Sequence, residues 1–199
     1  MKRFFASLLG VVSLLIISGC ANVSSAATYG THEISLKSLE TSVNQVLQER
    51  KNVDTSQMQL TTGADLTRGQ LQFLLTSGVI EEVARENKIS ITQSEVTAYK
   101  ESVYKQIGGA DKLPSVLVQA SIASQNLTMI LRRDVIIQKL TDAVIASGVA
   151  QADASAAIQE KILSTAKKLK ITVNPKYGTW NETSGLIEDA NAAGSAVNK

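Results

Sequence analysis

Residues 67–96 read TRGQLQFLLTSGVIEEVARENKISITQSEV, and the fold follows from this stretch. Its apolar residues recur every three or four positions, the spacing of one helical face. They are Leu71, Leu74, Leu75, Val79 and Val83, and Ile80 lies beside this stripe. Thr67 and Gln70 have the spacing of a capping box at the start of this helix. Asn87 can end the helix, because Asn tolerates the left-handed conformation better than most residues.

The same signals continue on both sides of this helix. A second capping box, Thr92 with Glu95, opens another helix that Gly108-Gly109 ends. Helical periodicity also predicts a helix from Ser35, a short helix over 112–120, a long helix over 124–146 and a last helix after Asp153. Extended segments are predicted at 28–34, with Gly30 at a turn, and at 171–173. We therefore expect a mainly α fold with a small antiparallel β patch that joins the N- and C-terminal segments.

The composition also favours helices over a β-sandwich. Only 4% of the 199 residues are aromatic and only two are proline. The length suits one domain with a sizeable core. We expect that domain at 28–181, followed at 182–199 by a small, polar and disordered tail.

The N-terminal segment has the layout of a bacterial export signal. Lys2 and Arg3 precede an apolar run, Phe4 to Ile17, that is shorter than the roughly 20 residues of a membrane-spanning helix. The run ends in Ile17-Ser18-Gly19-Cys20, which resembles the lipobox of bacterial lipoproteins. This resemblance implies a signal peptide at 1–19, lipidation of Cys20 with fatty acids such as palmitate, and a lipidated tether at 20–27. An ordinary secretory signal, cut near Ala26 or Ala27, is the alternative.

Removal of this signal changes the charge of the chain. The full sequence has 20 basic and 18 acidic residues, and without Lys2 and Arg3 both counts are 18. A neutral mature domain argues against nucleic-acid binding, which needs a basic face to neutralise phosphates. It also argues against recruitment to anionic lipid by charge alone.

The sequence offers little for covalent or metal chemistry. Cys20 is its only cysteine and His32 its only histidine, so neither a zinc site of several Cys and His ligands nor a Ser-His-Asp triad is expected. His32 is interpreted as a surface turn residue. Gly108-Gly109 lacks the Lys-Ser/Thr of a phosphate-binding loop. We expect no enzymatic activity, no metal and no cofactor.

Three segments resemble one family in the same order. The first is the hairpin and capped helix of 28–39. The second is Asn87-Lys88-Ile89-Ser90-Ile91-Thr92-Gln93-Ser94-Glu95-Val96, similar to the A-x-x-x-G-I-x-V-T-x-x-E-V join in the N-terminal domains of SurA and PrsA-type foldases, with Asn87 where Gly is usual. The third is Ile171-Thr172-Val173-Asn174-Pro175-Lys176-Tyr177-Gly178-Thr179-Trp180, similar to the V-x-V-N-P-R-Y-G-x-W/F ending of SurA-like actinobacterial lipoproteins.

This resemblance implies a helical chaperone domain outside the cytoplasmic membrane. It also implies that the strand at 171–173 pairs with Thr28-Tyr29. Foldases of this type usually carry a parvulin prolyl isomerase domain between the long helix and the last helix. Here only 147–152 separate those helices, so isomerase activity is not expected.

We therefore expect an ATP-independent holdase at the outer face of the cytoplasmic membrane, anchored through Cys20. Its partners would be unfolded or newly exported polypeptides, bound in an apolar groove. An interaction module that docks one specific partner is the alternative, and a prolyl isomerase ranks last. Four apolar residues off the main helical stripes are the candidates for the client-binding groove: Phe73, Ile80, Val135 and Ile136.

Overall fold

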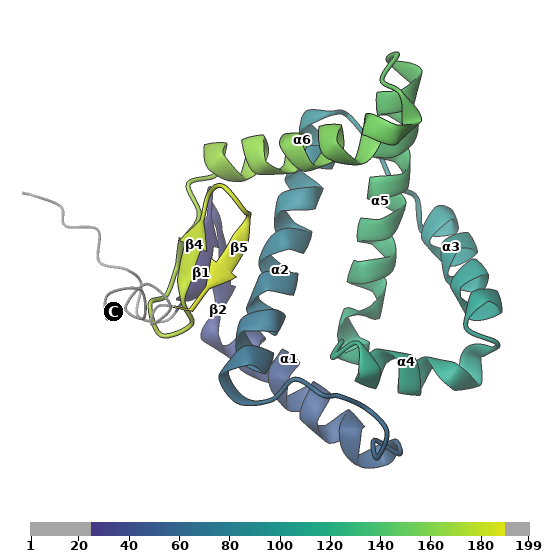
Figure 1. The fold of residues 1–199 in the computed structure, drawn as a ribbon, viewed down its shortest axis with the longest axis vertical. Helices are drawn as coiled ribbons and strands as arrows, with labels where there is room; N and C mark the ends of the chain where they lie inside the picture. Colours follow the sequence, from purple (N-terminus) through teal and green to yellow (C-terminus); the bar gives the residue numbers. More distant parts are fainter. Residues whose placement is uncertain (1–24, 190–199) are drawn as a thin grey trace, which may run out of the picture.

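Six helices and five short strands make up the part of the chain that the computed structural model describes, residues 25–189 (Figure 1). In chain order they are β1 (Ser25–Tyr29), β2 (His32–Ser35), α1 (Leu36–Glu49), α2 (Gly63–Glu86), α3 (Gln93–Gln106), α4 (Leu113–Gln119), α5 (Leu127–Ala146), α6 (Ala154–Lys168), β3 (Thr172–Val173), β4 (Thr179–Asn181) and β5 (Leu186–Glu188). The mainly α class with a small β patch is confirmed.

Helices α2 and α5 run through the middle of the molecule (Figure 1). Helix α6 crosses one end of this pair, α1 and α4 lie at the other end, and α3 flanks α5. The α2 stripe is buried as predicted, and Leu71, Leu75 and Val83 are fully enclosed. No helix within residues 25–189 is long and apolar enough to cross a bilayer.

The ends of the described chain meet in a three-stranded sheet with the order β2-β1-β3. Its antiparallel registers include Ala27 opposite Val173 and Thr28 opposite Thr172, so the predicted pairing of the two terminal segments is confirmed. The tether at 20–27 was assigned too far along the chain. The strand already begins at Ser25, and residues 25–27 are buried. Strands β2 and β3 pair with the two edges of β1, and Ala26 and Ala27 pack in the core with Leu71 and Leu75 of α2.

The disordered tail at 182–199 was also assigned too early. Residues 186–188 form β5, which pairs with β4 through Trp180 and Ile187. The carboxamide of Gln72 on α2 fixes this hairpin, because it donates to the Gly185 carbonyl at 3.0 Å and accepts from the Ile187 N–H at 2.7 Å. Residues 190–199 lie outside the described part of the chain.

Helix α2 begins at Gly63, four positions before the predicted capping box. The Thr67 hydroxyl lies inside the helix and donates to the Gly63 carbonyl. Gln70 caps nothing, because it is buried: it accepts from the Ser42 hydroxyl at 2.7 Å and donates to the Ser121 carbonyl at 2.6 Å. This network joins α1, α2 and the end of α4.

The C-terminal end of α2 has the two hydrogen bonds of a Schellman motif. Ile89 N–H donates to the Ala84 carbonyl and Lys88 N–H to the Arg85 carbonyl. Asn87 is the C-cap with φ of −91°, so the left-handed residue is Lys88, at φ of 56°. Asn87 instead donates its side-chain amide to the Val83 carbonyl at 2.7 Å.

Replacing Lys88 with Gly is expected to raise the free energy of unfolding by up to about 1 kcal/mol, because Gly adopts the left-handed conformation without a Cβ penalty. Lys105→Gly is the control, because Lys105 lies in the last turn of α3. There glycine should lower stability by about 1 kcal/mol. Urea denaturation measures both, and a destabilised Lys88→Gly variant would contradict the prediction.

The capping box predicted at Thr92 and Glu95 is present, with each side chain bonded to the backbone N–H of the other residue. Lys139 of α5 also pairs with the Glu95 carboxylate. The hydrogen bond from Lys139, followed by those from Thr92, lowers the pKa of Glu95 from 4.5 to about 2.

This pKa shift predicts that the Glu95–Lys139 pair between α3 and α5 stabilises the fold less in acid. Because the pKa is lower in the folded state, the ionised carboxylate stabilises the fold above about pH 4.5 and loses this effect as pH falls toward 2. Glu95→Gln should therefore show a smaller loss of stability between pH 5 and 2, measured as the urea midpoint. Glu101→Gln, exposed on the same helix, should retain the full acid dependence.

Candidate functional site

Of the cysteine and the histidine discussed above, the structure describes only His32. Cys20 lies outside the described residues. Within residues 25–189, no three His, Cys, Asp or Glu side chains gather in a way that could hold a metal ion. His32 is exposed, as predicted, but it begins strand β2 and does not lie in the turn before it. Its Nε2 lies 3.4 Å from Oε1 of Glu82.

Three of the four predicted client-binding residues belong to the core. Ile80, Val135 and Ile136 are only 4%, 5% and 0% exposed, so the prediction that they line an open groove was wrong. The cause is the number of helices that contact α5 and α2: α2, α3 and α6 pack against α5, and α1, α5 and α6 pack against α2. Side chains beside the main apolar face of each helix are therefore buried too.

Phe73 does line an open pocket, of about 330 Å³, between α2, the end of α4 and α5. The guanidinium of Arg133 lies 5.4 Å from the centre of its ring, within the range of a cation–π contact. Gln70 and Ser121, already bonded to one another, form part of the wall. This pocket therefore offers one aromatic face among polar groups.

A larger hollow of about 500 Å³ lies between the β1–β2 hairpin, α2 and the N-terminal half of α5. We call it the α2–α5 groove. Its lining includes Tyr29 and His32 of the hairpin, Leu74 and Gly78 of α2, and Met129 and Arg132 of α5. Met129 is 39% exposed, one of the few large apolar side chains that the fold leaves open to solvent.

Tyr29 forms one wall of the groove and is held in place from two sides. Its ring stacks on His32, with centroids 5.1 Å apart and planes 25° from parallel. It also lies directly against Gly78, where a Cβ would come within 2.8 Å of Tyr29 Cε2 and overlap the Cζ and hydroxyl positions. Burial, then the negative charges of Glu82 and Glu81, raise the pKa of Tyr29. Tyr29 is therefore a neutral, amphipathic wall.

The charged groups around the groove are paired with one another. Arg132 binds both oxygens of Glu81, at 2.6 and 3.1 Å, and also donates to the Ile91 carbonyl. Glu82 pairs with Arg85 and with His32. The hydrogen bond from Arg85 is the main cause of the lowered pKa of Glu82. The groove thus has an apolar centre and a polar rim of paired charges.

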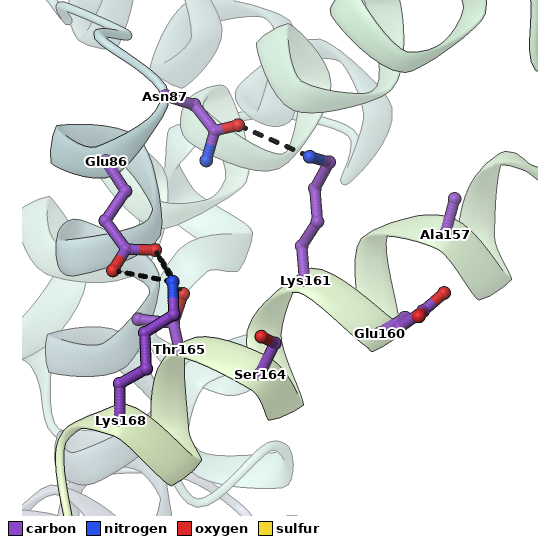
Figure 2. A pocket seen from close by; sticks show the side chains of 8 residues that line it. All are labelled: Glu86, Asn87, Ala157, Glu160, Lys161, Ser164, Thr165 and Lys168. Atoms are coloured by element: carbon purple, nitrogen blue, oxygen red, sulfur yellow. Dashed lines mark hydrogen bonds and ion pairs between the residues drawn. The ribbon is translucent and has the colours of Figure 1, made fainter.

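Another hollow, of about 690 Å³, is polar and lies between the end of α2 and α6 (Figure 2). Glu86 accepts from the Thr165 hydroxyl at 2.7 Å and from Lys168 at 3.2 Å, and Lys161 reaches Asn87 at 3.4 Å. The Thr165 bond is the largest cause of the lowered pKa of Glu86. The charged and polar lining of this hollow suits contact with polar groups better than the burial of apolar chains.

The groove residues were not predicted from the sequence. Gly78, a glycine inside a strongly predicted helix, was the available signal, because glycine there costs about 1 kcal/mol relative to alanine and calls for a packing reason. Met129 gave no comparable signal, because one apolar residue on a helix does not show whether tertiary packing covers it. Comparisons of the chain with protein-family models, with curated proteins and with solved structures found no match.

Proposed function

We propose that this protein is a lipid-anchored, extracytoplasmic holdase that binds unfolded or newly exported polypeptides in the α2–α5 groove. The observation that carries the proposal is the apolar centre of this groove, where the exposed Met129 lines the same hollow as Tyr29 and Leu74. The motifs that resemble SurA-type chaperone domains and the lipobox at Cys20 support the same function and its place at the membrane.

The groove has properties that suit a binder of varied apolar segments. Its volume of about 500 Å³ can take a few side chains of a client. Methionine is flexible and polarisable, so Met129 can adapt to clients of different shapes. Because Tyr29 and the charge pairs of the rim are fixed within the fold, binding needs little reorganisation of the groove.

A charge placed in this groove should weaken client binding. We expect residues 21–199 carrying Met129→Asp to suppress the aggregation of unfolded proteins several-fold less well than the unaltered residues 21–199. The reason is that the new carboxylate would have to lose water when an apolar segment binds. Val116→Asp is the matched control: Val116 is 38% exposed, against 39% for Met129, but lies on α4 outside the groove. Light scattering of several unrelated unfolded proteins measures the effect, and equal loss in both variants would contradict the groove assignment.

The alternative function is a module that docks one specific folded partner. The two proposals differ in breadth of binding. Suppression of aggregation of several unrelated proteins supports the holdase, whereas failure with all of them and recovery of one native partner supports the module. A prolyl isomerase ranks last, and a tetrapeptide isomerisation assay should show no rate above background.

The anchor can be tested independently of the groove. Mass spectrometry of the protein from the membrane fraction should find Cys20 as the first residue and carrying acyl chains. Stable anchoring needs two or more such chains. An unmodified N-terminus beyond Cys20 would refute the anchor and leave the groove proposal standing.

A further inference from the structure

We infer that one particular end of the domain faces the bilayer: the turn at 174–177 together with the first turn of α1. This inference rests on the proposed lipidation of Cys20. Cys20 precedes Ser25, the first residue of β1, by five positions. Even a fully extended chain of five residues spans only about 17 Å. The point where β1 begins is therefore held close to the lipid headgroups.

That point is fixed within the fold. The Ser25 carbonyl accepts from the side-chain amide of Asn174 at 3.1 Å, and the Ala26 carbonyl accepts from the Asn174 backbone N–H at 2.9 Å. Ser25 also lies opposite Ser35, the N-cap of α1. The start of β1 therefore moves together with the rest of the domain. Because only five positions separate Ser25 from Cys20, the range of orientations that the whole domain can take at the membrane is limited.

The surface beside this point carries residue types that suit a membrane interface. Pro175 and Lys176 are exposed, and the Lys176 ammonium lies 5.6 Å from the centre of the Tyr177 ring. Lys37, in the first turn of α1, is also exposed. Lysine at such a position places its charged tip among headgroups and its apolar stem below it, whereas Tyr177 is partly buried against the core. Asp189 at the same end is paired with Arg68 at 2.8 Å, and Arg68 donates to the Tyr177 carbonyl.

The orientation places the α2–α5 groove near the membrane but not against it. Tyr29 and His32 line the groove at the far end of β1, four positions from Ser25. Four steps along a strand cover about 13 Å. With the chain between Cys20 and Ser25 fully extended, the groove would therefore lie within about 30 Å of the lipid. Exported chains would be bound as they leave the membrane.

Site-specific fluorescence on the full-length lipidated protein tests this orientation. Because the only native thiol, Cys20, would be acylated, an introduced cysteine is the sole site for a fluorophore. Lys176→Cys places the fluorophore on the proposed membrane face. Gln151→Cys is the control, exposed in the turn between α5 and α6. That turn lies across the molecule from β1 (Figure 1).

Both labelled proteins are incorporated into vesicles of phosphatidylethanolamine and phosphatidylglycerol in which part of the lipid carries a doxyl quencher. We expect quenching at position 176 to exceed that at position 151 several-fold. Equal quenching at the two positions, or stronger quenching at 151, in a protein that is membrane-bound would overturn the orientation. A protein absent from the membrane fraction would contradict the proposed lipidation itself, so the two failures are distinguishable.

Discussion

Replacing Ile136 with Ala should lower the free energy of unfolding by about 2–5 kcal/mol, the range for deleting most of a buried isoleucine side chain and leaving a cavity. Ile136 is 0% exposed and belongs to the core shared by α2, α5 and α6. Helices on several sides of α5 limit how far the site can collapse. Urea denaturation at neutral pH, with the slope checked for two-state behaviour, measures the change.

Met129→Ala provides the matched comparison on the same helix. Because Met129 is 39% exposed, its truncation should change stability by no more than about 0.5 kcal/mol. The two variants separate a core role from a binding role. If Ile136→Ala left stability unchanged and instead weakened client binding, Ile136 would line a groove after all and the burial seen in the structure would be contradicted.

The elements that sequence reasoning predicted well are those in which the local signal and the tertiary environment agree. The α2 stripe and the capping box of Thr92 and Glu95 need only spacing along one helix. The pairing of β1 with β3 came from the family resemblance, since no local pattern indicates which strands meet.

The errors arose where burial depends on elements distant in sequence. A stripe identifies one buried face, but α5 is contacted by α2, α3 and α6, so Val135 and Ile136 are buried as well. The spacing of Gln70 from Thr67 predicts a cap, whereas its amide completes a buried network with Ser42 and Ser121. The tail was assigned too early because β5 depends on Gln72 of α2, which no local pattern around 182–189 reveals.

The candidate groove could not be predicted for a related reason. Tyr29, Gly78 and Met129 come from a hairpin, a helix and another helix, and only the tertiary fold brings them to one hollow. The local role of each residue is ordinary: Tyr29 belongs to a strand, Gly78 lies in the interior of a helix, and Met129 lies on a helix face. Tyr29 reaches α2 at Gly78, where its ring lies against the helix backbone because glycine has no side chain.

Gly78→Ala should therefore lower stability and reshape the groove, although alanine is the better helix former. The added Cβ would overlap the Tyr29 ring, so the ring must rotate away, lose its stack on His32 and leave its half-buried site. Overpacking of this kind costs about 1–3 kcal/mol, which outweighs the roughly 1 kcal/mol gain in helix propensity. Because the displaced ring is a groove wall, suppression of client aggregation should also fall, as measured by light scattering beside urea denaturation.

Gly69→Ala separates this steric effect from helix propensity. Gly69 lies in the same helix, and nothing lies within 4 Å of the position that its Cβ would take. That variant should gain up to about 1 kcal/mol, because alanine loses less backbone entropy than glycine on helix formation. Opposite signs in the two variants would identify the Tyr29 contact as the cause. A stabilised Gly78→Ala variant with full client binding would show instead that Tyr29 moves freely and that the groove does not depend on its position.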